Sequence, residues 1–141
     1  MSKNSLKRAQ TKQYLKQIAL CDCCIKVIQT ELHEQQTQQK EGAILLNDYE
    51  PAPPNPELLQ DLRGQEEKRS HIIQQIESMD NPLQRDVLMQ YYAMGEVLYK
   101  IAAALSYSED RIAHVHLEAL DTFFQKYLSK DETVIKDNAG D

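Results

Sequence analysis

The sequence predicts an all-α protein in which a long N-terminal helical hairpin is followed by a compact helical head. Apolar residues recur at steps of three and four along most of the 141 residues, which is the spacing of one helical face. Asn or Ser precedes several of these stretches and can cap the free N–H groups of a helix. No stretch alternates as a strand would, and four Gly and five Pro leave long runs without helix breakers.

Changes in composition divide the chain into five segments. Basic residues dominate the first 16 positions, which contain no acid, whereas acids dominate the last 11. The expected segments are an N-terminal helix with a basic arm (1–41), a Pro-rich loop (42–56), a second long helix (57–80), the helical head (81–128) and an acidic flexible tail (129–141). The basic arm consists of Lys3, Lys7, Arg8 and Lys12.

The first helix is expected from about Lys7 to Gln39 and has apolar residues on two sides. One apolar line contains Tyr14, Ile18, Cys21, Ile25, Ile28 and Leu32. A second line, formed by Leu20, Cys23 and Val27, lies nearly opposite. A helix that is apolar on two sides needs two partners, so the second line predicts a homodimer interface.

Two cap-and-proline signatures begin the next helices. Asn55-Pro56-Glu57 places a capping amide, a proline suited to the first helical position and an acid at the positive helix end. The buried stripe of that second long helix is expected to be Leu58, Leu62, Ile72, Ile76 and Met79. Asp80-Asn81-Pro82 repeats the signature and opens the head.

The head is expected to contain three short helices joined by tight turns. The first runs from Leu83 to Ala93, and Gly95 then allows a turn because it accepts a positive φ. The second runs from Glu96 to Leu105 and is followed by a turn at Ser106-Tyr107. Ser108 caps the third helix, and its first turn carries acids. This layout is typical of a helix-turn-helix.

The segment YYAMGEVLYKIAAALSYSEDRIAHVHLEAL, residues 91–120, resembles the sigma-factor region-four type of helix-turn-helix. The variant it is most similar to occurs in small phage transcriptional regulators, the RinA and ArpU types of late-gene activator. The matching features are Tyr91-Tyr92, Gly95, Ile101-Ala102, Tyr107-Ser108, His116 and Ala119-Leu120. The stretch TKQYLKQIALCDCCIKVIQTEL, residues 11–32, also resembles the opening helix of some of these phage proteins.

The resemblance implies that the third helix of the head enters the major groove of double-stranded DNA. On this basis Glu109, Arg111 and His114 would face base edges, while Ser108, Tyr99 and Lys100 would meet phosphates. The implied function is promoter binding and late-gene activation in the cytoplasm of a bacterial host, with host RNA polymerase as a further partner.

The charge pattern departs from that family, whose members usually carry several basic residues on this helix. Here Glu109, Asp110, Glu118 and Asp121 oppose Arg111 and Lys126, and the whole chain has a net charge of −6. Counterion release by such a head would be small, so DNA binding would depend on the basic arm, on a dimer or on polymerase. The alternative hypothesis is a protein-interaction module that binds a host repressor, polymerase or nuclease.

Other functional classes find little support in the sequence. Three cysteines are an odd number and favour reduced thiols in a cytoplasm. Cys21, Cys23 and Cys24 stand too far from His33 to share a metal, and His114 and His116 point apart. No Ser/His/Asp order, glycine-rich phosphate loop, membrane-length apolar run or N-terminal apolar signal is present. We therefore expect no catalysis, no cofactor, no metal and no membrane partner.

Overall fold

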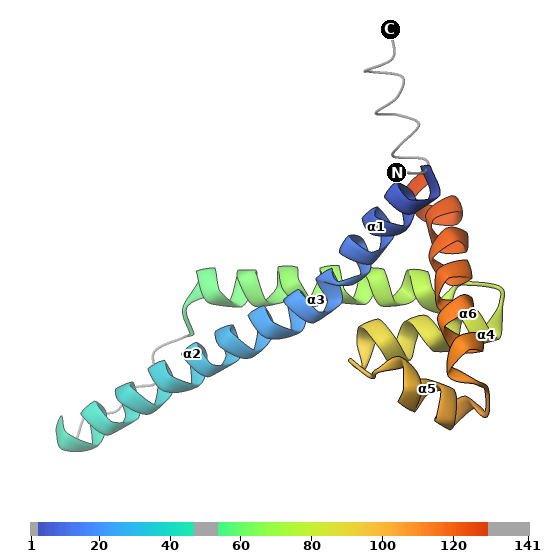
Figure 1. The fold of residues 1–141 in the computed structure, drawn as a ribbon. Coiled ribbons are helices and arrows are strands. Elements are labelled where there is room, and N and C mark those ends of the chain that lie inside the picture. Colours follow the sequence, from blue (N-terminus) through green and yellow to red (C-terminus); the bar gives the residue numbers. More distant parts are fainter. Residues whose placement is uncertain (1–2, 47–53, 130–141) are drawn as a thin grey trace, which may run out of the picture. The chain divides into compact units, whose positions relative to one another are not determined.

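A computed structural model describes residues 3–46 and 54–129, and every regular element in these ranges is a helix (Figure 1). The all-α prediction is thus confirmed. The helices are α1 (Lys3–Leu15), α2 (Gln17–Leu46), α3 (Pro56–Glu77), α4 (Pro82–Leu88), the π-helix η1 (Met89–Ala93), α5 (Leu98–Leu105), α6 (Glu109–Phe123) and the π-helix η2 (Phe124–Leu128). The chain forms two compact units, residues 1–19 with 71–141 and residues 20–70.

The expected single helix from Lys7 to Gln39 is wrong, because the chain is interrupted at Lys16 and forms α1 and α2 instead. Residues 11–20 contain neither Gly nor Pro, so the local sequence does not explain the interruption. Leu15 and Ile18, on either side of it, are both fully buried in the first unit. Both residues therefore belong to the same core, although the helix is interrupted between them.

The expected end of the first segment at residue 41 is also wrong, since α2 continues to Leu46. The residues after Gly42 are Ala, Ile and Leu, all of which tolerate a helix, and a single Gly in a helix costs only about 1 kcal/mol. The part of the Pro-rich loop from 47 to 53, and the tail from 130 to 141, lie outside the described residues.

The second unit contains most of α2 and α3. The backbone N–H of Glu57 donates to Asn55 Oδ1 at 2.9 Å, which is the cap that the sequence predicts. One charged contact joins the two helices within this unit, an ion pair of 2.5 Å between Arg69 Nε and Asp22 Oδ1. Among the described residues, no helix is both long enough and apolar enough to cross a membrane.

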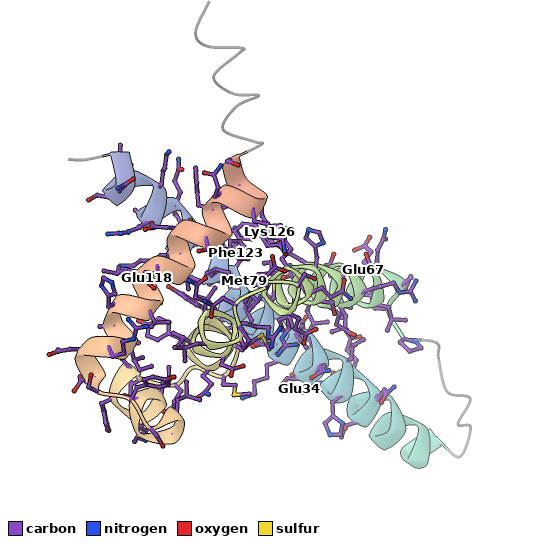
Figure 2. All side chains as sticks on the ribbon, turned by 90° about the vertical axis from the view of Figure 1, so that its right-hand side faces the viewer. Glu34, Glu67, Met79, Glu118, Phe123 and Lys126 are labelled. Carbon is purple, nitrogen blue, oxygen red and sulfur yellow. The ribbon has the colours of Figure 1, made fainter. Side chains whose placement is uncertain are left out.

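Helix α6 is the central element of the first unit and packs against α1, α4 and α5. Its buried side joins a core built from distant parts of the chain, in which Met79 and Phe123 lie close together (Figure 2). The fully or almost fully buried members of this core are Leu15, Ile18, Ile72, Ile76, Met79, Leu88, Tyr92, Ala119, Leu120 and Phe123. Ile72, Ile76 and Met79 belong to the stripe that the sequence predicts for the second long helix.

A second, smaller cluster holds the head together. Ile101 and Ala102 of α5 pack with Ile112 and Val115 of α6 and with Val87 of α4, and all five are buried. The spacing of these residues along each helix is the one expected from the sequence. Consequently α5 and α6 lie against each other through small and branched apolar side chains.

Caps and turns in the head follow the sequence closely. Asn81 Oδ1 accepts from the backbone N–H groups of Leu83 and Gln84 at 3.0 and 3.1 Å, and so begins α4. Gly95 has φ +70°. Ser106 ends α5 in the left-handed conformation with φ 64°, which a non-glycine residue adopts at a cost.

We predict opposite effects of alanine at Gly64 and at Gly95. Gly95→Ala should lower the free energy of unfolding by about 1 kcal/mol, because a Cβ at φ +70° is strained although nothing lies within 4 Å of it. Gly64→Ala should raise it by about 1 kcal/mol, because Gly64 lies inside α3 with open space around it. Urea unfolding followed by circular dichroism measures both.

Ser106→Gly completes this set and should stabilise the protein by up to about 1 kcal/mol, since it removes the Cβ from the left-handed position. Destabilisation by Ser106→Gly, or equal effects of the two alanine substitutions, would contradict the turn geometry.

Candidate functional site

The N-terminal half of α6 has one buried side and one exposed side. Ser108 Oγ accepts from the backbone N–H of Arg111 at 3.1 Å, so the predicted serine cap is present. Ile112 and Val115 face the core. The other side chains of the first two turns that the sequence assigns to DNA, Glu109, Arg111 and His114, are all exposed.

Helix α5 supplies the remaining two predicted contact residues. Tyr99, with 58% of its surface exposed, and Lys100 occupy the first turn of α5, opposite the buried Ile101 and Ala102. The helix is two residues shorter than expected and starts at Leu98 rather than Glu96. Glu96 instead accepts from the backbone N–H of Val97 through Oε1 at 3.2 Å, just ahead of the helix.

Two of the four acids on α6 are paired with basic side chains. His114 Nε2 lies 2.9 Å from Glu118 Oε1, one turn along the same helix. Asp121 accepts two bonds from Arg8 of α1, from Nε at 2.9 Å and from Nη2 at 2.8 Å. The bidentate geometry fixes the guanidinium against α6 more firmly than a single contact would. Glu109 and Asp110 remain in the first turn, where acids favour the positive helix end.

The basic arm is a helix packed on the first unit, not a free extension. Residues from Lys3 onward belong to α1, Arg8 is held by Asp121, and Lys7 Nζ lies 5.4 Å from the centre of the Phe124 ring. Lys12 is half-buried, and the side chain of Lys3 lies outside the described residues. Packing holds this helix in place, because Thr11 and Leu15 of α1 are fully buried.

A polar pair lies inside the first unit between η1 and α6. The Tyr92 hydroxyl and His116 Nε2 are 2.8 Å apart, and both residues are about 6% exposed. The Tyr91 ring packs on both of them. Burial, and to a smaller extent the charge of Lys12, lowers the pKa of His116 to about 4. His116 is therefore neutral near pH 7 and serves packing.

The three cysteines of α2 lie in different environments within the second unit. Cys21 is buried and burial raises the pKa of its thiol, whereas Cys23 and Cys24 are exposed. Within residues 3–46 and 54–129, no three His, Cys, Asp or Glu side chains are grouped to hold a metal ion. Cys21 thus behaves as a small apolar residue.

Several exposed residues beside the site were not assigned a contact with a ligand from the sequence. Asp110 follows Glu109 in the first turn of α6, and Tyr107 is 46% exposed in the turn before it. Met94 and Val97, between η1 and α5, are 72% and 45% exposed. The serine cap gave the position of Asp110, but no pattern in the sequence distinguishes an apolar residue that stays exposed.

Comparisons with protein-family models, curated proteins and solved structures find no match to this chain. The interpretation of the site consequently depends on its residues and their geometry.

The buried His116 predicts a pH dependence of stability. The unfolded histidine takes up a proton near pH 6.5, but the folded one does so only near pH 4. The contribution of His116 to the free energy of unfolding should be complete above pH 6.5. It should decline by about 3 kcal/mol as the pH falls to 4. Urea unfolding from pH 7 to 4 measures this for the wild type and for His116→Gln, whose amide can still reach Tyr92.

The difference between these two proteins isolates residue 116 from the carboxylates that titrate in the same range. His114→Gln is the matched control, because His114 is exposed. A wild type and His116→Gln variant that lose stability in parallel would contradict the prediction.

Proposed function

We propose that the protein is a transcriptional regulator of the phage type that binds promoter DNA through a sigma region-four-like helix-turn-helix. In this proposal α5, the turn at Ser106-Tyr107 and α6 are the helix-turn-helix, and α2 and α3 are the helical hairpin that precedes the head. The observation that carries the proposal is the serine-capped start of α6, which exposes Arg111 and His114 while α5 covers its other side.

The exposed start of α6 has side chains suited to base edges. An arginine can donate two bonds to O6 and N7 of guanine, and a carboxylate can accept from the cytosine amine. Glu109 and Arg111 both lie in the first turn of α6, and His114 lies one turn beyond Asp110. Ser108, Tyr99 and Lys100 lie at the helix starts and would contact phosphates, which fix orientation rather than sequence.

The pairing of acids on α6 reduces the electrostatic objection to DNA binding. Asp121 is neutralised by Arg8, and Glu118 has His114 beside it. Asp121 therefore does not present a full unpaired charge to a phosphate. Glu109, Asp110 and Glu118 stay unfavourable for an approaching duplex, although in the proposal Glu109 accepts a hydrogen bond from a cytosine amine.

The proposal also includes a homodimer and host RNA polymerase as partners in the cytoplasm of a bacterial cell. The dimer is supported by the second apolar line of α2, whose residues Leu20 and Val27 are 64% and 59% exposed and whose Cys23 is exposed as well. Exposed aliphatic side chains at helical spacing are typical of a face that another helix covers.

A second candidate function, docking to a host protein, is favoured by one observation. Three large apolar residues of the head are exposed near the start of α5. Met94 and Val97 precede the helix, and Tyr99 lies in its first turn. Aromatic and Met side chains are enriched at protein interfaces. A host protein would bind to the same head in this case, but at a different surface from the exposed side of α6.

The DNA-binding proposal predicts that Arg111→Ala weakens sequence-specific binding by about 10-fold to 100-fold, since a good arginine–guanine pair contributes about 1–3 kcal/mol. Fluorescence polarisation with a duplex selected from a random library by the wild type measures the effect. Arg63→Ala is the matched control, because Arg63 is an exposed arginine of α3. Binding by the control should be unchanged.

Failure of the wild type to retain any duplex at low salt, where charged contacts are strongest, would rule out direct DNA binding. Docking to a protein would then be the better account of the exposed residues near α5.

The dimer proposal predicts a solution mass of about twice 16.3 kDa by light scattering. The double variant Leu20→Glu with Val27→Glu should be monomeric, because it places charges on the apolar line. Gln29→Glu, an exposed position of α2 that adds a charge outside this line, should stay dimeric. A monomeric wild type at high protein concentration would show the dimer to be wrong.

A further inference from the structure

Contacts between α1 and α6 occur in antiparallel order. Lys7 lies over the ring of Phe124, at the end of α6, and Arg8 donates to Asp121, one turn earlier in α6. Lys12 is one turn after Arg8 on the same edge of α1. Its charge acts on His116, a further turn toward the start of α6. Lys12 is therefore the basic residue of these three that lies nearest the DNA-facing half of α6.

The two edges of α6 are covered by different helices. Ile112 and Val115 mark the edge that packs on α5. Asp121 marks the other edge, which meets α1 through Arg8. Ala113 and Leu117 precede Asp121 at steps of four and are half-buried like it, so they continue this edge toward the start of α6. The exposed His114 lies between the two edges, with the half-buried Glu118 one turn beyond it.

The three basic residues of α1 differ in what they can offer a ligand. Arg8 has both of its described bonds directed to one carboxylate, and Lys7 lies against an aromatic ring. Lys12 is half-buried and forms no ion pair with any carboxylate in the described part of the chain. An ammonium group with three donors and no acid beside it is suited to a phosphate oxygen.

We propose that Lys12 is a phosphate-contacting residue, and that α1 and α5 hold the DNA backbone on the two sides of α6 through Lys12 and Lys100. This inference rests on the proposed DNA-binding function and adds a second phosphate contact, on the side of α6 opposite α5. The docked α1 would supply the phosphate contact expected of the basic arm, with one lysine held at a fixed distance from α6 by the Arg8–Asp121 pair. Phosphate contact of this kind adds affinity without sequence preference.

The salt dependence of binding tests the assignment. Each phosphate neutralised contributes about 0.9 to the slope of log K against log salt for duplex DNA. We expect Lys12→Gln to reduce the magnitude of the slope by about this amount with a fluorescein-labelled mixed-sequence duplex. Lys100→Gln should do the same, and the double variant should lose about twice as much.

Three further variants separate charge from structure. Lys12→Met keeps the apolar stem and should match Lys12→Gln, whereas Lys12→Arg keeps the charge and should retain the wild-type slope. Lys26→Gln removes one positive charge from an exposed position of the second unit and should leave the slope unchanged.

The outcomes distinguish this inference from the function on which it rests. A wild type that binds the duplex, together with an unchanged slope in Lys12→Gln, overturns the phosphate contact and leaves the DNA-binding proposal standing. The phosphate contact is also overturned if Lys12→Arg reduces the slope of log K against log salt as much as Lys12→Gln does. An equal reduction in Lys26→Gln overturns it as well. Absence of any wild-type binding at low salt overturns both proposals together.

Discussion

Burial of one side of α6 is the constraint on which the first unit depends. Its apolar side chains, among them Ile112, Leu120 and Phe123, are fully buried against helices that come from both ends of the chain. Each such side chain contributes about 1.5–3 kcal/mol when it leaves water. Because α6 must be covered along its whole length, α1 is required at its end and α5 at its start. The exposed strip that remains is the part of α6 that can meet a ligand.

Electrostatics in the first unit follows from the same packing. Docking of α1 brings Arg8 to Asp121 and Lys7 to Phe124, so charges that appear free in the sequence act within the fold. Burial also keeps His116 neutral beside Tyr92. The net charge of the chain is therefore a poor guide to the field around α6, because the acids and bases that determine this field are distributed by tertiary contacts.

The second unit exposes an apolar line on α2 that no other part of its described residues covers. On α2, Cys21 is buried while Leu20 and Val27 are exposed, so the two apolar lines seen in the sequence have different environments. A helix with apolar residues on two sides lowers its free energy when both are covered. The dimer proposed above would cover the second line.

Local sequence is sufficient to predict the helical class, the helix starts at Asn55, Asn81 and Ser108, and the turns at Gly95 and Ser106. Caps and turns depend on residues within about four positions, so their chemistry is present in the local sequence. Helical periodicity is also local, so it predicted the buried sides of α5 and α6 and the burial of Ile72 and Ile76 on α3. Leu58 and Leu62, which belong to the same predicted stripe of α3, are only half-buried.

Only the tertiary structure decided the break at Lys16, the π-helical turns η1 and η2, and the docking of the basic segment. Arg8 and Asp121 are 113 positions apart, and no local pattern pairs residues at that distance. The resemblance supplied the six expected contact residues, and the structure leaves all of them exposed: Ser108, Glu109, Arg111, His114, Tyr99 and Lys100. The different environments of Lys7, Arg8 and Lys12 were not predictable, because they depend on which helix α1 covers.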